Sequence, residues 1–297
     1  MKLISLITLF LLSTMTGCSQ QDASSHEPEV VETHNLKTEY RFAVHPLHNP
    51  TRLFDVFNPL LEYLNNNINN VHFILEASRD YETFDNKLKE KTVSFALPNP
   101  YQTLIALENN YRVIAKMGDD INFKGIILVR KDSHIRKPKD LKGKSVSFPA
   151  PTALAATMLP QYFLHTHGLN INKDITNKYV GSQESSIMNV FLGTTSAGAT
   201  WPPPWQALSN ERPELKEQLE VIWETQSLPN NSIVIRDDVP DILAIQVQTL
   251  LANLHNTVEG KLILKKMYLS KYETADNETY NSVKKFVATF DKTVRPL

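Results

Sequence analysis

GIILVRKDS, at residues 125–133, and NNSIVIRDDVP, at residues 230–240, have a similar pattern. Each is an apolar run typical of a β-strand, followed by Arg, by charged residues and by a turn. We interpret them as two hinge strands, at which the chain leaves a first lobe and later returns to it. The expected first lobe covers residues 39–130 and 230–297, and the expected second lobe covers residues 131–229.

Strand-like and helix-like segments alternate along most of the chain. YRFAV (40–44) and VHFILE (71–76) predict strands, and TRLFDVFNPLLEYLN (51–65) has apolar residues at helical spacing. From residue 241 the pattern is mostly helical. This order predicts an α/β fold with two lobes, each a mainly parallel sheet flanked by helices. Ligands of such folds bind where strand carboxyl ends and helix N-termini converge, which here is the cleft between the lobes.

The N-terminus has the features of a secretory signal. A positive charge at Lys2 precedes an apolar run, Leu3–Leu12, that is too short to span a bilayer. We expect a signal peptide at residues 1–17. Cys18, the only cysteine of the sequence, then resembles the cysteine that bacterial lipoproteins acylate. The alternative is a secreted protein with an incidental cysteine.

A polar segment follows the cysteine. Residues 18–38 contain too few large apolar side chains to form a core, so we expect a flexible tether between a lipid anchor at Cys18 and the folded body. The protein would then lie at the periplasmic face of the membrane. With its one cysteine in the anchor, the body would have no disulfide and no cysteine-ligated zinc.

The composition argues against several classes of function. The 297-residue chain has 41% hydrophobic residues and a formal net charge of −1, and its charges are mixed, without the basic stripe of a nucleic-acid surface. No G-x-S-x-G, H-E-x-x-H, P-loop or G-x-G-x-x-G motif occurs. We therefore expect neither an enzyme nor a bound cofactor, but a monomer whose partner is a small molecule.

Four histidines form two close pairs, His45 with His48 and His165 with His167. A metal site needs three or four converging ligands, and neither pair has obvious partners. We expect structural or solvated histidines and no metal. His45 is the most interesting of them, because it ends the first predicted strand, where the clefts of solute-binding proteins begin.

Four segments, taken in order, resemble a known family. They are FKGIILVRKDSHIRKPKDLKGKSVSF (123–148), YVGSQESSIMNVFLGTTSAGA (179–199), LPNNSIVIRDDVP (228–240) and TVEGKLIL (257–264). These segments are similar to the periplasmic phosphate/phosphite/phosphonate-binding family, the substrate-binding proteins of ABC importers, which have a two-lobed Venus-flytrap fold. The resemblance implies capture of a small oxyanion by hinge closure and delivery to an ABC permease in the membrane. Signalling by the same fold to a membrane kinase or cyclase stays open as an alternative.

The resemblance implies an oxyanion site at the turn after DLKGKSVSF. There the family has Pro-Ser-Ser-Thr-Ser-Gly before a proline-containing helix, and hydroxyl and backbone N–H groups hold the phosphonate oxygens. Alignment on Pro160 places this motif at residues 151–156, where only Thr152 keeps a hydroxyl. The implied ligands are the Thr152 side chain and the backbone N–H groups of Ala153, Leu154 and Ala155. In the alternative, Thr152 is only the N-cap of the helix.

The next helix of the second lobe offers further candidates. Where the family has Gly-Ser-His, this chain has GSQ at residues 181–183, so that a neutral amide replaces an imidazole. Ser182 is a good N-cap, and Gln183 and Ser185 are then free to face the cleft. The acid with which the family meets a ligand amino group falls near Trp201, which argues against an aminoalkyl ligand. The segment WPPPW, which begins at Trp201, forms either a cleft wall or a rigid corner.

Two tyrosines are candidates from the first lobe. Asn99-Pro100-Tyr101 resembles the family's Gly-Pro-x-x-Tyr corner, with the tyrosine shifted earlier, and Tyr81 resembles a tyrosine that lines the family's cleft. Each phenol could donate its O–H to an oxyanion from the lobe opposite the helix N-terminus. Tyr101 could instead be a half-buried core residue.

Overall fold

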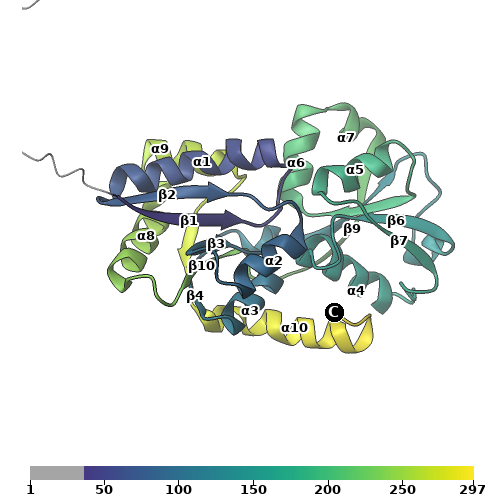
Figure 1. Ribbon diagram of the computed structural model, residues 1–297. Helices are drawn as coiled ribbons and strands as arrows, with labels where there is room; N and C mark the ends of the chain where they lie inside the picture. Colours follow the sequence, from purple (N-terminus) through teal and green to yellow (C-terminus); the bar gives the residue numbers. More distant parts are fainter. Residues whose placement is uncertain (1–36) are drawn as a thin grey trace, which may run out of the picture. The chain divides into compact units, whose positions relative to one another are not determined.

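The strands of the protein form two sheets in a computed structural model, which describes residues 37–297 (Figure 1). The first sheet has six strands in the order β11-β4-β10-β3-β1-β2. Its strands are β1 (Thr38–Val44), β2 (Val71–Glu76), β3 (Phe95–Leu97), β4 (Tyr111–Met117), β10 (Ser232–Arg236) and β11 (Tyr272–Thr274). β1 pairs in parallel with β2 and β3, whereas β10 is antiparallel to β3 and β4, and β11 is antiparallel to β4.

The second sheet has five strands in the order β7-β6-β8-β5-β9. They are β5 (Lys124–Arg130), β6 (Lys144–Phe148), β7 (Ile175–Tyr179), β8 (Ala197–Thr200) and β9 (Leu219–Ser227). β6 pairs in parallel with β7 and β8, and β5 is antiparallel to β8 and β9. Both sheets are thus mixed, because β5 and β10 enter an interior position of each sheet against the direction of their neighbours.

Helices cover both sheets and follow their strands as the alternating pattern predicts (Figure 1). The helices of the first lobe are α1 (Pro50–Asn67), α2 (Tyr81–Lys89), α3 (Pro100–Glu108), α8 (Asp241–Asn253), α9 (Val258–Lys266) and α10 (Asn281–Thr293). Those of the second lobe are α4 (Leu159–Thr166), α5 (Gln183–Phe191), α6 (Pro202–Glu211) and α7 (Glu214–Gln218). Among the described residues, none of these helices is long and apolar enough to cross a membrane.

The core of the first lobe is built on aromatic side chains of its parallel strands. Phe42, Phe73 and Phe95 are buried, and the rings of Phe73 and Phe95 meet edge to face with their centroids 5.1 Å apart. In β2 the odd-numbered residues are buried and His72 and Ile74 are exposed, the period-two pattern of a strand with one covered face.

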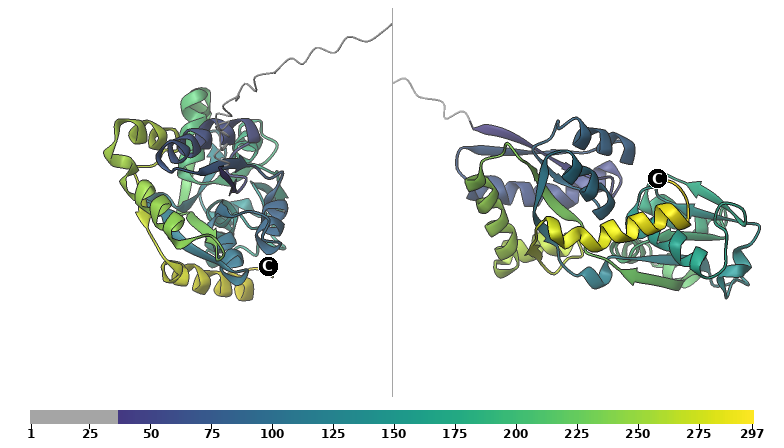
Figure 2. Two further views of the ribbon diagram at one scale, coloured as in Figure 1. Left: turned by 60° about the vertical axis from the view of Figure 1, so that its left-hand side comes forward. Right: turned by 90° about the horizontal axis from the view of Figure 1, so that it is seen from below.

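Three segments cross between the lobes. The chain leaves the first sheet after β4, through a short 3₁₀ turn (Asp120–Asn122), and returns between β9 and β10. Helix α10 then runs alongside both lobes, as Figure 2 shows. Its end reaches the second lobe, where the rings of Phe286 and Tyr162 lie 5.5 Å apart and Asn172 donates a hydrogen bond to the Val294 carbonyl.

Three details differ from the sequence-based expectation. Residues 124–130 were assigned to the first lobe, but as β5 they pair only with strands of the second sheet. The mostly helical C-terminal part contains a short strand, β11, which binds the free edge of β4. The prolines of WPPPW form the first turn of α6, where a missing N–H is tolerated.

A close contact in the second lobe fixes the helix that follows β6. This helix begins with a π-helical turn (Leu154–Met158) that continues into α4. A β-carbon added at Gly125, in β5, would lie 2.5 Å from the Ala155 carbonyl oxygen and 2.6 Å from the Pro160 ring. Only glycine allows the strand to approach the turn so closely, and the strand thereby sets the position of residues 153–156.

We expect Gly125→Ala to lower the melting temperature, because the new methyl group would force β5 and the π-helical turn apart. Overpacking of this kind costs about 1–3 kcal/mol, and each kcal/mol shifts the midpoint of a protein of this size by about 2–4 °C. Differential scanning calorimetry measures the change. Lys178→Ala, on the exposed face of β7, should melt with the wild type, and a Gly125→Ala variant that does the same would contradict the proposed constraint.

Candidate functional site

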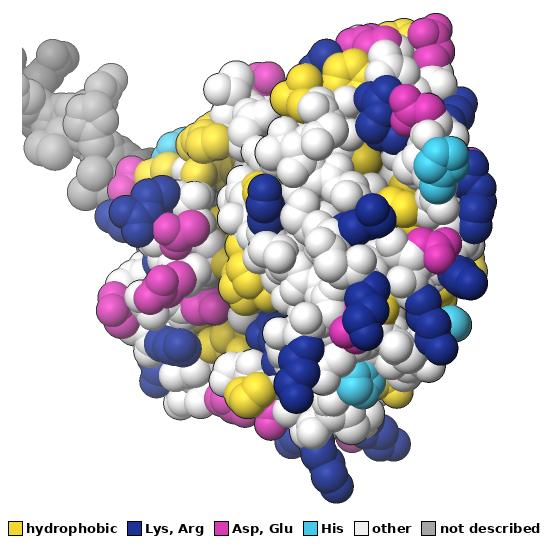
Figure 3. Space-filling model, turned by 90° about the vertical axis from the view of Figure 1, so that its right-hand side faces the viewer, with side chains coloured by type: hydrophobic (Ala, Val, Ile, Leu, Met, Phe, Trp, Pro, Cys, Tyr) yellow, Lys and Arg dark blue, Asp and Glu magenta, His cyan; other side chains and the backbone are white. Residues whose placement is uncertain are grey.

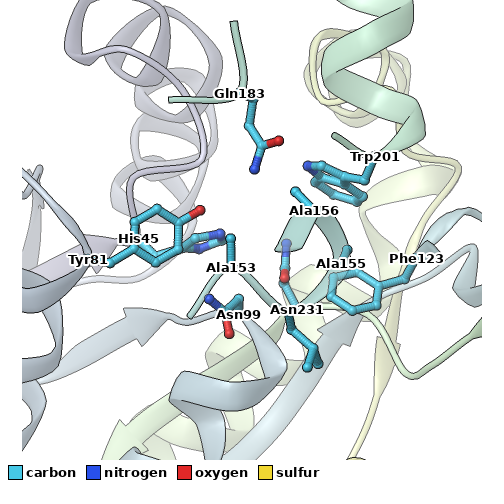
Figure 4. A pocket seen from close by; sticks show the side chains of 11 residues that line it. His45, Tyr81, Asn99, Phe123, Ala153, Ala155, Ala156, Gln183, Trp201 and Asn231 are labelled. Atoms are coloured by element: carbon cyan, nitrogen blue, oxygen red, sulfur yellow. The ribbon is translucent and has the colours of Figure 1, made fainter. Parts of the chain in front are cut away.

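A pocket lies where the two lobes meet, at the carboxyl ends of the parallel strands of both sheets (Figure 4). Its first-lobe wall consists of His45, Tyr81, Asn99 and Asn231, and Phe123 stands at the crossing between the lobes. Its second-lobe wall consists of Ala153, Leu154, Ala155, Ala156, Gln183 and Trp201. The free volume between these walls is about 10 Å³, the space of roughly one water molecule.

The sequence-based candidates divide into two groups. Those that line the pocket are Tyr81, Ala153, Leu154, Ala155, Gln183 and Trp201. Thr152, Ser182, Ser185 and Tyr101 are not among the lining residues. That the lining residues bind a ligand remains a prediction.

Tyr81 begins α2 and faces the second lobe. Asp80 caps the helix by accepting a hydrogen bond from the Thr83 backbone N–H, which places Tyr81 in the first turn. The phenol is 5% exposed. Burial raises its pKa well above the ordinary value of 10.0, against the opposing effect of its hydrogen bond with the Gln183 side chain. Tyr81 therefore stays protonated and keeps an O–H that can donate.

Gln183 is the matching group of the second lobe, at the first position of α5. Its Oε1 accepts a hydrogen bond of 2.8 Å from the Thr200 hydroxyl, so its Nε2 is left to donate toward Tyr81 and the pocket. Ser182 caps the helix, because its Oγ accepts from the Ser185 N–H at 3.0 Å and donates to the Ser185 hydroxyl at 2.9 Å. These two serines satisfy each other, which explains why neither lines the pocket.

The turn after β6 presents backbone rather than hydroxyl groups. Ala153 to Ala156 are buried, and the first N–H groups of the π-helical turn have no acceptor within the helix. The Ala153 N–H, expected to bind the ligand, instead donates to the Ala150 carbonyl at 3.3 Å, so the N–H groups without a partner in the turn begin at Leu154. Ala153, not Thr152, stands at the N-cap position, and no side chain caps this helix. The alternative role of Thr152 as an N-cap is therefore wrong.

Asn99 joins the two lobes directly. It caps α3 by accepting hydrogen bonds from the backbone N–H groups of Tyr101 and Gln102, and it donates through Nδ2 to the Thr152 carbonyl at 3.3 Å. Tyr101, in the first turn of this helix, packs against the hydrophobic core instead of lining the pocket.

Sequence reasoning noted His45 for its place at the end of the first strand without counting it as a ligand residue, and it missed Asn99, Phe123, Ala156 and Asn231 as pocket residues. Phe123 directly precedes β5, and Asn231 directly precedes β10. The similarity of the two hinge segments could have pointed to both, because equivalent turns reach the same edge of each sheet. The Phe123 and Trp201 rings meet at 5.6 Å and form an aromatic wall.

The pocket carries no formal charge. Among the described residues that line it there is no Lys, Arg, Asp or Glu, and burial lowers the pKa of His45 to about 4, which keeps its ring neutral. On the outer face drawn in Figure 3, Lys and Arg lie among Asp and Glu. Within residues 37–297, no group of three or more His, Cys, Asp or Glu could hold a metal ion.

One buried carboxyl group lies a helical turn beyond Tyr81. Asp85 is 9% exposed and accepts a hydrogen bond of 2.6 Å from Gln102. Burial raises the pKa of Asp85 from 3.8 to about 6, although the Gln102 hydrogen bond acts in the opposite direction. Between these two values the folded protein holds a proton that the unfolded chain has lost, so the stability falls as the pH rises through this window.

We expect Asp85→Asn to remove this loss, because the amide stays neutral and its oxygen can still accept from Gln102. The variant should match the wild type near pH 4 and exceed its free energy of unfolding by about 1–3 kcal/mol near pH 7. Urea unfolding at both pH values measures the difference. Asp55→Asn, on an exposed position of α1, should show no such pH-dependent gain, and a destabilised Asp85→Asn at pH 7 would contradict the interpretation.

Comparison with known proteins identifies a family for this chain. The family model described as "ABC transporter, phosphonate, periplasmic substrate-binding protein" matches residues 42–280. A curated relative, the probable ABC transporter phosphite binding protein PhnD1 of Prochlorococcus marinus (strain MIT 9301), is 24% identical over 196 residues. The match covers 62% of this chain and 66% of that relative.

Solved structures agree in fold. PhnD1 of the same organism, in complex with methylphosphonate, is 19% identical with a TM-score of 0.79, over 86% of this chain and 99% of that chain. A binding protein component of an ABC phosphonate transporter from Pseudomonas aeruginosa is 16% identical with a TM-score of 0.78, over 86% and 88% of the two chains. At these identities the likeness concerns the fold, and it confirms the predicted two-lobed α/β class.

Proposed function

The chain belongs to the family of periplasmic substrate-binding proteins of phosphonate ABC transporters, and we propose that it binds a small phosphorus oxyanion in the pocket between its lobes. Members of this family bind and deliver a substrate, and they work with a permease in the membrane. The resemblance of four sequence segments to this family is thereby confirmed.

The observation that carries the proposal is a set of uncharged donors that converge from both lobes. The Tyr81 phenol and the Gln183 amide meet across the pocket, the Trp201 indole nitrogen lies on the side of Gln183 in Figure 4, and the backbone of Ala153 to Ala156 closes the opposite side. Neutral donors aimed at one point stabilise an anion without the desolvation cost of a buried cation.

The apolar part of the wall favours a small substituent on the ligand. The Phe123 and Trp201 rings and the alanine methyl groups form this part. A phosphite hydrogen or a short alkyl group of a phosphonate would pack there. The names of the relatives agree with this size, since PhnD1 is called a phosphite binding protein and was solved with methylphosphonate.

The small free volume supports hinge closure around the ligand. The space between the walls, about 10 Å³, holds roughly one water molecule, and a tetrahedral oxyanion of several heavy atoms needs more room, so we propose that the lobes part to admit it. We propose that they rotate about the crossings between β4 and β5 and between β9 and β10. Contacts such as Asn99 with Thr152 would then form on closure.

The proposal includes the expected location. Cys18 and residues 1–17 lie outside the described residues, and we propose that they supply a lipid anchor and a signal peptide. The expected tether of residues 18–38 is one residue too long, because Thr38 already pairs with Val71 in β1; we propose that the segment before Thr38 holds a monomeric body at the periplasmic face of the membrane, within reach of the ABC permease.

We expect phosphite or methylphosphonate to raise the melting temperature of the protein. A ligand at 100 times its dissociation constant adds about 2.7 kcal/mol of stability. Tyr81→Phe should weaken binding by about 10- to 100-fold, because it removes a donor to a charged ligand. Calorimetric titration of wild type and variant measures the loss.

The matched control is Tyr101→Phe, since Tyr101 is also in the first turn of a first-lobe helix but does not line the pocket. It should bind as the wild type does. Equal losses in both variants would point to a general effect on the lobe, and no binding of any phosphorus oxyanion would reject the proposed ligand class.

Closure should depend on a buried pair between the lobes. His48 Nδ1 lies 3.3 Å from Glu184 Oε1, and both side chains are largely buried. Although burial raises the pKa of Glu184, the hydrogen bond and charge of His48 lower it below the ordinary value of 4.5. We expect Glu184→Gln to require about tenfold more ligand to compact the protein, which corresponds to about 1.4 kcal/mol.

Small-angle X-ray scattering during a ligand titration measures the compaction. Neutralising a carboxylate near an anion would by itself tighten binding, so a weaker response identifies the lost contact. Glu214→Gln is the control, because Glu214 pairs with Arg212 within the second lobe. A titration curve of Glu184→Gln that superimposes on that of the control would exclude this pair from closure.

A further inference from the structure

His45 presents a hydrogen-bond acceptor to the pocket. Its Nδ1 lies 2.9 Å from the Leu97 carbonyl oxygen. A carbonyl only accepts hydrogen bonds, so Nδ1 must carry the ring proton. Burial lowers the pKa of His45 to about 4, so the ring is neutral at physiological pH. In this tautomer Nε2 has a free lone pair and no proton.

The position of the ring directs this lone pair to the ligand. His45 is 2% exposed and lines the pocket, and Figure 4 shows its nitrogen-bearing edge toward the pocket interior. Among residues 37–297, none forms a hydrogen bond with Nε2, whereas Nδ1 and the backbone N–H both bond the Leu97 carbonyl. The ring is thus held firmly, with one acceptor left for a ligand.

Asn231 adds a second acceptor. It is 1% exposed, and its Oδ1 is buried without a hydrogen-bond partner among the described residues. Its Nδ2 lies 3.5 Å from the Met117 sulfur. A thioether sulfur accepts weakly and cannot donate, so this contact favours the orientation in which Nδ2 meets the sulfur and Oδ1 has no partner among the described residues.

The pocket therefore combines donors with uncharged acceptors. Tyr81 and Gln183 donate, and His45 and Asn231 accept. A ligand satisfies both kinds of group only if it has anionic oxygens and also an O–H of its own. The monoanion of a phosphonate has both, whereas a sulfonate of the same size and charge has no proton to give.

Building on the proposed function, we propose that His45 selects the singly protonated form of the phosphorus oxyanion, with the ligand P–O–H donating to Nε2 and Asn231 Oδ1 reinforcing the selection. A deprotonated oxygen would face lone pairs there and would leave buried acceptors unpaired. Sites that hydrogen-bond a substrate hydroxyl reject analogues without it by large factors. His45 is then a specificity-determining residue, which separates phosphorus from sulfur oxyanions.

The other titratable groups near His45 are few. Tyr81 packs its ring edge-on at 6.0 Å, His48 lies in the same loop and acts on His45 through its charge, and Glu184 of α5 pairs with His48. Because some of these can change charge with pH, the test needs a ligand of fixed charge as its reference.

The experiment is calorimetric titration of the purified protein with methylphosphonate and with methanesulfonate, from about pH 5.5 to about pH 9, a range that spans the second ionisation of the phosphonate. The two ligands differ in the P–O–H group. We expect methylphosphonate to bind at least about 100-fold more tightly at the low end. Its affinity should fall about tenfold per pH unit above its second pKa, while the affinity for methanesulfonate stays level.

His45→Phe tests the residue itself. The Leu97 carbonyl keeps the hydrogen bond from the backbone N–H of residue 45 at 3.1 Å, so the substitution leaves no orphan there. The preference for methylphosphonate should shrink to less than about tenfold, and its pH dependence should flatten. His72→Phe, the same change on an exposed position of β2, should bind like the wild type.

The outcomes separate the two proposals. Two results with the wild type would reject the role of His45 and leave the proposed function standing. In the first, methylphosphonate binds no more tightly than methanesulfonate. In the second, methylphosphonate binds more tightly as it loses its second proton. An unchanged preference in folded His45→Phe rejects this role as well. If neither ligand, phosphite nor phosphate binds, the proposed function fails, and this inference fails with it. Should His45→Phe not fold, the pH profile of the wild type still decides.

Discussion

The pocket depends on the antiparallel placement of β5 and β10 in the interior of the two sheets. Each of these two strands begins at the edge of its sheet where the parallel strands end. The segments that precede β5 and β10 therefore lie beside the loops that follow the parallel strands and line the pocket. Phe123 and Asn231 stand in these segments. In the second sheet, Gly125 also allows β5 to touch the turn that contains Ala155. The crossings and the pocket wall therefore share residues, and under the proposed function a change of angle at the crossings would change the pocket.

The absence of formal charge from the described pocket wall has a physical consequence. A buried cation would attract any oxyanion, and the strength of that attraction would depend little on the arrangement of oxygens and protons. Hydrogen bonds from fixed neutral groups depend strongly on direction and on which partner holds the proton. Tyr81 and His45 are both kept neutral by burial, so the discrimination resides in donors and acceptors. The same burial that weakens attraction for anions in general makes recognition of one protonation state possible.

The sequence predicted the fold from features that are local. Alternation of apolar periods and the likeness of the two hinge segments do not depend on distant contacts, and the two-lobed α/β class is confirmed. The local sequence could not predict the sheet in which residues 124–130 pair, because a strand at a crossing between the lobes can join either sheet. The candidates at Tyr81, Gln183 and Trp201 reached the pocket wall. Ser182 and Ser185 did not, since counting hydroxyls ignores that the two can satisfy each other. His45, Asn99 and Asn231 are brought together only by strand order.

Two of the contacts between the lobes are weak. Arg52 and Glu211 form an ion pair across the lobes, but its carboxylate is largely exposed, and such pairs contribute little. The hydrogen bond from Asn99 is long, at 3.3 Å. Asn231 Oδ1 is buried without a hydrogen-bond partner among the described residues, which costs free energy. Under the proposed function, a ligand that donates to such acceptors and accepts from Tyr81 would bind a closed arrangement better than an open one. That difference in affinity is what a ligand needs to shift the equilibrium between the lobes, and it would tie delivery of the ligand to the correct oxyanion.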